Sequence, residues 1–225
     1  MININKNSKI SIIAPHPDDE TIALGGSIAK FSELGCDISI LIISGHLPPL
    51  YPQEVFEKTK QEAAEAFLIL GVNNYEFAYI PATYVHQKPI SELNKIISNF
   101  IKKNQSDIVF LPFPDRHIDH RVIFDSSVVA CRPVGKKYPE LVLTYETLSE
   151  THWNVPGIEA QFAPEVFVDI SDFIEIKLEA LSKYKSQLKN ADSRSIDACK
   201  SLSRFRGSQN GCKYAEAFKL IRMII

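Results

Sequence analysis

The sequence has no long apolar run, no signal peptide and almost no net charge, and each absence excludes a class of protein. No stretch approaches the roughly 20 apolar residues of a membrane-spanning helix. The first residues lack an apolar segment followed by a small-residue cleavage site. The formal net charge is -2 over 225 residues, whereas nucleic-acid-binding chains usually carry a marked basic excess. We therefore expect a cytoplasmic protein with no membrane span and no nucleic-acid partner.

Paired cysteines and phosphate-binding loops are also missing. The four cysteines lie far apart and form no CxxC pair, which favours reduced thiols over a secreted disulfide scaffold. Neither a GxGxxG turn nor a P-loop follows the first predicted strand. Residues 15–19 there read PHPDD, and their carboxylates would repel a pyrophosphate. A nucleotide-binding or NAD-dependent Rossmann enzyme is therefore an unfavoured alternative.

The sequence does contain short β-branched runs that alternate with amphipathic segments. Hydrophobic residues make up 45% and charged residues 23%, as in ordinary globular domains. This alternation predicts an α/β fold with a mostly parallel sheet covered on both faces, in a single domain over 1–225. We expect strands at 9–14, 37–43, 75–80, 107–111, 140–145 and 165–170, and helices at 21–34, 54–70, 91–103, 121–130, 171–188 and 214–225. The polar composition of 190–211 favours a surface excursion over a loop-rich lid.

Two clusters of acidic residues and histidines each follow a predicted strand directly. Residues 14–20 read APHPDDE, and residues 115–120 read DRHIDH. Open α/β sheets bind their ligands at the carboxyl ends of the strands, so we expect the two clusters at one edge. Catalytic zinc sites use three His, Asp or Glu ligands and keep one position open. His16 and Asp19 can supply two ligands and leave Asp18 or Glu20 for proton transfer, which indicates metal-assisted hydrolysis.

Other interpretations of these residues are less specific. Acidic residues at 18–20 suit the first turn of a helix, where they complement the helix dipole, but this does not explain a histidine between two prolines. His46 follows the second predicted strand and lies either in the same cleft or on a surface loop. His86 and His152 have ordinary polar surroundings. Trp153 is either a packing residue or a platform for a sugar ring.

The strand ending in HPDDE and the later DxHxDH resemble the LmbE-like or PIG-L family of zinc-dependent N-deacetylases. Residues 211–218 (GCKYAEAF) are similar to that family's closing segment, as is the helix that contains Glu62 and Ala66. The likeness spans nearly the whole chain. It implies a Rossmann-like three-layer α/β/α sandwich. It also implies a hydrolase that removes acetyl from N-acetylglucosamine-type sugars, in polysaccharide or glycoconjugate biosynthesis.

The resemblance also implies a role for each cluster residue. His16, Asp19 and His120 would bind zinc, and Asp18 would be the general base. His117, oriented by Asp119 and charged as an imidazolium, would stabilise the oxyanion. Mixed histidine and aspartate ligation tolerates several metals, so another divalent ion such as Fe2+ is compatible with the same site.

The sequence departs from the family at positions that tend to touch substrate. Residues 44–49 (SGHLPP) stand where many members have a Gly-Glu-rich loop, and residues 81–84 (PATY) lack a frequent aspartate. Many members also carry an arginine at the start of the helix that follows the loop at residues 44–49. Here only Lys58 or Lys60 could take the place of that arginine. The identity of the acetylated sugar and its linkage therefore stay open.

The remaining expectations concern partners and rival functions. Residues 145–153 and 162–164 resemble members linked to surface-polysaccharide assembly. The main rival is a zinc amidase acting on a non-sugar or thiol-conjugate N-acyl substrate. A binding protein with a vestigial metal site is disfavoured because every expected position is filled. The sequence is also compatible with a homo-oligomer.

Overall fold

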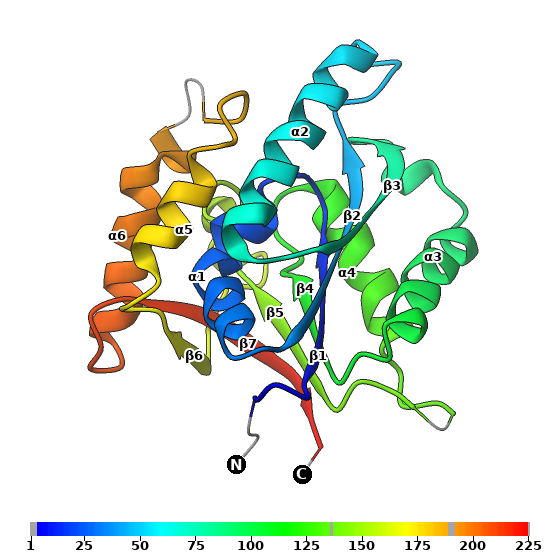
Figure 1. Cartoon of the computed structure of the whole chain (residues 1–225). Coiled ribbons are helices and arrows are strands. Elements are labelled where there is room, and N and C mark those ends of the chain that lie inside the picture. Colours follow the sequence, from blue (N-terminus) through cyan, green and yellow to red (C-terminus); the bar gives the residue numbers. More distant parts are fainter. Residues whose placement is uncertain (1–3, 136, 189–191, 225) are drawn as a thin grey trace.

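Seven strands form one sheet in which five neighbouring strands run parallel (Figure 1). The structure is a computed structural model that describes residues 4–135, 137–188 and 192–224. The pairs β1–β2, β2–β3, β1–β4 and β4–β5 are parallel, whereas β7 is antiparallel to β5 and β6. Across the sheet the strands are β3 (Asn74–Pro81), β2 (Asp37–Gly45), β1 (Lys9–Ala14), β4 (Ile108–Pro112), β5 (Leu141–Tyr145), β7 (Ala215–Met223) and β6 (Val166–Asp169).

Helices cover both faces of the sheet, which confirms the predicted three-layer α/β/α architecture (Figure 1). One layer contains α1 (Asp19–Glu33), α2 (Gln53–Leu70), α5 (Ile174–Leu181) and α6 (Ile196–Ser208). The other contains α3 (Ile90–Lys103) and α4 (Ile118–Ala130), which pack against each other. The described residues also contain the short 3-10 helices η1 (Val85–Gln87), η2 (Thr151–Trp153) and η3 (Asp192–Arg194). Among the described residues, no helix is both long and apolar enough to cross a membrane.

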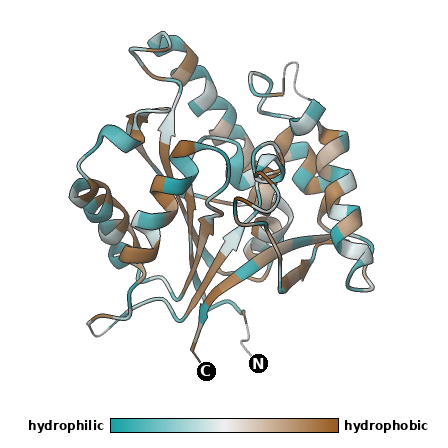
Figure 2. Ribbon diagram, turned by 180° about the vertical axis from the view of Figure 1, so that it is seen from behind, coloured by the Kyte–Doolittle hydropathy of each residue, from teal (hydrophilic) through white to brown (hydrophobic). Residues whose placement is uncertain are grey.

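The central strands are buried on both sides, because each face of the sheet is covered by helices. Ile10 and Ile12 of β1 pack into the apolar cluster beneath α1 and α2, whereas Ile13 packs into the cluster beneath α3 and α4. Strands buried on both faces are expected to be nearly continuous β-branched runs, as residues 9–14 are. Figure 2 shows the resulting apolar strands in the middle of the molecule.

The prediction of a helix over 214–225 was wrong, since residues 215–223 form strand β7. Alanine, glutamate, lysine, leucine and methionine are good helix formers, and they dominate this segment. The sheet nevertheless takes it up between β5 and β6, where Phe218 pairs with both Tyr145 and Val166. Phe218 is fully buried, so burial and strand pairing outweigh local propensity.

The predicted helix over 171–188 is shorter in the structure, because α5 ends at Leu181. The chain beyond it turns towards two buried carboxylates. The hydroxyl of the buried Tyr184 donates to Glu20 at 2.6 Å, and the backbone N–H of Ser186 donates to Glu62 at 3.0 Å. These polar contacts end the helix and fix the following loop beside α1 and α2.

The surface excursion predicted over 190–211 is mostly helix α6, although its first two residues lie outside the described residues. Ser195 caps this helix, and its hydroxyl accepts the N–H of Ala198 at 3.1 Å. The inward face carries Cys199, Ser203 and Arg206. Because this buried face is largely polar, the segment shows little apolar periodicity, which is why the pattern did not predict a helix.

The strand order reverses between β1 and β4, with β2 and β3 on one side and β5 on the other. A crevice forms at such a switch point outside the carboxyl ends of the strands, and ligands bind there in open α/β sheets. Residues 15–20 follow β1, and residues 113–120 follow β4. The prediction that both clusters lie at one edge of the sheet is therefore confirmed.

Candidate metal centre

The loop after β1 holds Asp18 in an uncommon backbone conformation. The carbonyl of Pro15 accepts hydrogen bonds from the N–H and the hydroxyl of Ser44, at 2.8 and 2.9 Å, which ties the loop to β2. Asp18 then has φ 122°, a region that residues with a side chain avoid. Such strain is concentrated at functional sites. The side chain makes no helix-capping bond, and its buried Oδ2 has no hydrogen-bond partner among the described residues.

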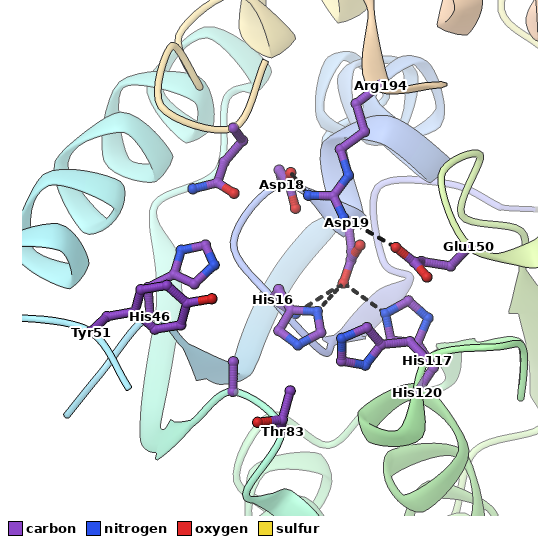
Figure 3. A pocket seen from close by; sticks show the side chains of 12 residues that line it. His16, Asp18, Asp19, His46, Tyr51, Thr83, His117, His120, Glu150 and Arg194 are labelled. Atoms are coloured by element: carbon purple, nitrogen blue, oxygen red, sulfur yellow. Dashed lines mark hydrogen bonds and ion pairs between the residues drawn. The ribbon is translucent and has the colours of Figure 1, made fainter. Parts of the chain in front are cut away.

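The second cluster forms the start of α4. The N–H of His117 donates to Asp115 at 3.1 Å, and the Nδ1 of His117 accepts the N–H of Asp119 at 3.1 Å. His117 is therefore the N-cap of α4. This capping arrangement puts His120 in the first turn of the helix, fully buried and facing the loop after β1 (Figure 3).

The three residues predicted as metal ligands converge on one carboxylate oxygen (Figure 3). The Oδ2 of Asp19 lies 3.1 Å from the Nδ1 of His16 and 3.3 Å from the Nε2 of His120. Ligand atoms around a tetrahedral ion with bonds of about 2.0–2.1 Å lie about 3.3 Å apart. The buried Nε2 of His120 has no partner in hydrogen-bond geometry among the described residues, despite its distance from Asp19. These atoms therefore fit a bound divalent metal.

The other ring nitrogens of His16 and His120 both contact carboxylates. The Nε2 of His16 lies 3.1 Å from the Oδ2 of Asp119, and the Nδ1 of His120 lies 2.9 Å from the Oδ1 of Asp115. Metal-binding histidines commonly donate their second ring N–H to a carboxylate, which fixes the tautomer and the ring orientation. Asp119 also accepts the N–H of Thr83 at 2.7 Å. Asp115 thus supports a candidate ligand, a role that the sequence did not assign to it.

Asp119 contacts His117, the ring that it is predicted to orient, through its backbone N–H, whereas no hydrogen bond joins that ring to its carboxylate. That carboxylate contacts His16 instead and lies 4.0 Å from the Nδ1 of His117. Burial, together with the charges of His16 and His120, lowers the pKa of His117 to about 4. The ring is therefore neutral. Because its Nδ1 accepts a backbone N–H, its proton is on Nε2.

His117 also belongs to a second possible ligand set. Ring nitrogens of His16, His117 and His120 all lie within 4.8 Å of one another. Metals bind the unprotonated nitrogen of a neutral imidazole. With Nδ1 taken by the Asp119 N–H, the protonated Nε2 of His117 is a hydrogen-bond donor. This contact pattern favours Asp19 over His117 as the third ligand.

The electrostatics of the cluster favour positive charge among the candidate ligands. Burial acts to lower the pKa of His16, but its hydrogen bonds with Asp119 and Asp19 outweigh burial and raise it to about 9. For His120, Asp19 and Asp115 likewise outweigh burial and raise the pKa to about 10. Burial acts to raise the pKa of Asp19, yet His120 and His16 hold it well below its usual value. The same carboxylates would stabilise a divalent cation bound between these residues.

The pKa of Asp18 is shifted in the opposite direction from that of Asp19. Burial and the neighbouring charge of Asp19 raise the pKa of Asp18 well above its usual value, against the opposing effect of Arg194. A carboxylate with a raised pKa has an increased affinity for protons. The buried, unbonded Oδ2 of Asp18 is therefore suited to accept a proton at the pocket.

The surrounding pocket contains residues that the sequence predicted and others that it did not. His46 lines the pocket, whereas Trp153 is 69% exposed and does not. Lys60 lies over the rings of Phe56, Phe77 and Tyr79 and pairs with Glu57. Neither Lys58 nor Lys60 lines the pocket, so neither stands in for the arginine. The complete lining is His16, Asp18, Asp19, His46, Tyr51, Ala82, Thr83, His117, His120, Glu150, Gln187 and Arg194.

Glu150, Gln187 and Arg194 were missed as pocket residues. Glu150 follows β5, Gln187 follows α5, and Arg194 ends η3. No motif surrounds them, and each reaches the pocket because its segment is anchored elsewhere, as Ser186 is on Glu62. The serine at position 195, whose hydroxyl accepts the N–H of Ala198, is a helix-capping residue type and is the local signal from which the helix after Arg194 could have been inferred.

Comparisons with known proteins agree with the site and the fold. Residues 11–131, more than half of the chain, match the family model PIG-L, described as GlcNAc-PI de-N-acetylase. The chain is 26% identical to the diacetylchitobiose deacetylase of Thermococcus kodakarensis, over 96% of this chain and 84% of that protein. It is 29% identical to the uncharacterized deacetylase YaiS of Escherichia coli, over 81% of this chain and 93% of that protein.

A solved structure shares the fold. The N,N'-diacetylchitobiose deacetylase from Pyrococcus horikoshii superposes with a TM-score of 0.76 at 24% identity, covering 96% of this chain and 85% of that chain. The TM-score shows that the two chains share a common architecture. The mostly parallel sheet with helices on both faces therefore occurs in a deacetylase structure.

Proposed function

The chain belongs to the PIG-L family of the GlcNAc-PI de-N-acetylase type, and on this premise we propose that it is a metal-dependent deacetylase of N-acetylated amino sugars. One observation carries the proposal. His16 and His120 meet at a single oxygen of Asp19, and the unbonded carboxylate of Asp18 lies in the same pocket. The named substrate of the Thermococcus relative, diacetylchitobiose, supports an N-acetylglucosamine-type sugar.

We assign His16, Asp19 and His120 as the residues that would hold the metal. Zinc fits best because catalytic zinc sites combine three His, Asp or Glu ligands with an open position, although Fe2+ or another divalent ion suits the same donors. When bound, the ion supplies Lewis acidity that activates water near neutral pH and polarises the acetyl carbonyl. Asp119 and Asp115 would hold the two histidine rings in place.

Asp18 would act as general base and then as general acid. Its carboxylate takes a proton from the attacking water as the new carbon–oxygen bond forms at the acetyl carbon. It then delivers that proton to the sugar nitrogen as the carbon–nitrogen bond breaks, so that acetate and a free amine leave. The Nε2–H of His117 donates a hydrogen bond to the oxyanion that develops on the acetyl oxygen.

A substrate panel and one substitution test this proposal. The metal-loaded protein is expected to release acetate from N-acetylglucosamine conjugates and not from acyl-amino compounds without a sugar. Asp18→Asn is expected to keep its metal, measured by elemental analysis, and to lose turnover by about 100-fold or more. Normal turnover in that variant would remove Asp18 from its role. A preference for the non-sugar amides would favour the rival amidase function.

We also place this activity in polysaccharide or glycoconjugate biosynthesis. The support is the likeness of residues 145–153 and 162–164 to family members linked to surface-polysaccharide assembly. The pocket is lined mainly by polar side chains, which suits a sugar substrate.

A further inference from the structure

One pair of charged side chains in the pocket has no part in the proposed chemistry. Arg194 donates through its Nη2 to the Oε1 of Glu150 at 3.1 Å, and its Nη1 lies 3.9 Å from the Oδ2 of Asp18. Among the described residues that line this pocket, Arg194 is the only lysine or arginine. A guanidinium beside an active site usually binds an anionic group of a ligand. Here it is already placed between two carboxylates.

The scaffold keeps Arg194 and Glu150 together. Arg206 of α6 makes a buried, two-fold ion pair with Glu146, with distances of 2.7 and 2.6 Å. Glu146 and Glu150 both lie in the loop that follows β5. Arg194 lies just before α6, the helix that contains Arg206. The two ion pairs therefore connect the same two segments. The side chain of Glu150 is only 21% exposed and that of Arg194 31% exposed. The Glu150–Arg194 pair therefore forms part of the wall of the pocket.

The charges of this wall disfavour an anionic substituent on the substrate. A phosphate or carboxylate that approached Arg194 would also approach Glu150 and Asp18, which lie on either side of the guanidinium. Like charges brought together in a partly buried site repel strongly, and proteins use such repulsion to reject the wrong ligand. The N–H groups of Arg194 that do not face Glu150 still suit neutral hydroxyl acceptors.

An aromatic pair lies on another side of the pocket and suits the same kind of ligand. The rings of His46 and Tyr51 are 4.4 Å apart, and both line the pocket. Figure 3 shows them on the side of His16 away from Glu150. Aromatic faces pack well on the apolar C–H face of a pyranose ring. The pocket thus combines a ring-stacking surface with a polar wall whose guanidinium is already paired with Glu150.

We propose that the Glu150–Arg194 pair makes this pocket specific for uncharged N-acetylated sugars and excludes those that carry a phosphate or carboxylate beside the acetamido-bearing ring. The inference rests on the proposed deacetylase function and narrows its substrate class. Glu150 is the specificity-determining residue, because it occupies the guanidinium that an anionic substrate would need. Arg194 is a substrate-binding residue for sugar hydroxyls.

The first experiment compares matched substrates on the metal-loaded wild-type protein. Acetate release is measured for N-acetylglucosamine and diacetylchitobiose, and for the phosphate monoesters of N-acetylglucosamine. The uncharged sugars are expected to have a kcat/KM at least about tenfold higher. Equal or better turnover of the phosphate esters would overturn the specificity inference but leave the deacetylase function intact. Acetate release from none of the sugars would instead contradict the proposed function.

The second experiment removes the carboxylate that blocks the guanidinium. Glu150→Gln is expected to raise kcat/KM for the phosphate esters by about tenfold, mainly through KM, with metal content unchanged. Arg194→Met is expected to raise KM for the uncharged sugars. Glu165→Gln, exposed before β6 and outside the pocket, and Arg204→Met, exposed on α6, are the matched controls and should alter neither preference. An unchanged substrate preference in a folded, metal-containing Glu150→Gln protein would overturn the inference.

Discussion

His117 and His120 lie within one turn of the same helix, but the atoms around their Nδ1 nitrogens differ. The Nδ1 of His120 contacts the carboxylate of Asp115, whereas the Nδ1 of His117 accepts a backbone N–H. The Asp115 carboxylate can accept the Nδ1–H of His120, which leaves Nε2, the nitrogen that faces Asp19, as the one that would bind a metal. The backbone neighbour leaves the proton of His117 on Nε2. The group that contacts Nδ1 therefore makes His120 a candidate metal ligand and His117 a candidate hydrogen-bond donor.

Alanine substitutions test this division at the residue scale. His120→Ala is expected to lose metal affinity by more than about 100-fold, because it removes a ligand. His117→Ala should keep the metal and lower kcat by about 100-fold, the usual effect of deleting an oxyanion donor. Elemental analysis after dialysis and single-turnover kinetics provide the two readouts. Loss of metal from His117→Ala would favour the set of three histidines as ligands.

Helix α6 and the loop after β5 form the element that completes the pocket. Arg206 of α6 and Glu146 connect them through a buried ion pair, and Arg194 of the preceding η3 pairs with Glu150 at the pocket. His152 also contacts Glu146 at 3.2 Å. Breaking a buried pair leaves an unpaired charge in a poorly solvated position. The placement of the pocket wall should therefore depend on Glu146.

The contribution of Glu146 to stability should depend on pH. Burial acts to raise its pKa, but hydrogen bonds from His152 and Arg206 outweigh burial and hold the pKa below its ordinary value. A group with a lowered folded pKa stabilises the fold fully above its unfolded pKa, near 4.3, and loses that contribution as the pH falls through the folded pKa. Glu146→Gln should therefore cost about 3–5 kcal/mol at pH 7, and less as the pH falls below about 4.

Urea unfolding of both proteins over this pH range measures the difference. The exposed Lys103–Glu76 pair provides the control, since Glu76→Gln should cost less than about 1 kcal/mol at any of these pH values. A difference between wild type and Glu146→Gln that did not shrink in acid would contradict this account of the pair.

At the scale of the whole molecule, the metal would connect two segments that follow different strands. His16 and Asp19 come after β1, and His120 comes after β4, about one hundred positions later. The unfolded chain does not hold these residues together, so a metal that binds the folded protein stabilises it by linkage. The closely spaced carboxylates of this edge also repel one another without a cation.

Metal addition should therefore raise the thermal stability. A free zinc concentration about 1,000-fold above Kd adds about 4 kcal/mol, or an increase in Tm of about 10 °C for a chain of this length. Thermal unfolding with and without a chelator measures the shift. Asp19→Asn should lose most of it, whereas His86→Gln, at an exposed position outside the pocket, should keep it. An undiminished shift in Asp19→Asn would exclude Asp19 as a ligand.

The sequence by itself determined the central sheet and the chemical identity of the candidate site. β-Branched runs buried on both faces leave a continuous apolar signal, so residues 9–14 were predictable as a strand. HPDDE and DxHxDH each come directly after such a run. Because the carboxyl ends of parallel strands lie at one edge of a sheet, the two motifs are expected at the same edge. Patterns of this kind involve residues that are close together in the sequence, so the sequence alone reveals them.

The tertiary structure decided what lies far from any motif. Residues 215–223 have the composition of a helix but complete the sheet between two strands, and α6 was hidden because its buried face includes Arg206 and Ser203. The Asp119 carboxylate contacts His16, whereas His117 accepts the Asp119 backbone N–H, and Glu150 and Arg194 form an ion pair across 44 positions of the sequence. Contacts between distant segments depend on the geometry of the packed chain, and the local sequence pattern does not contain that geometry.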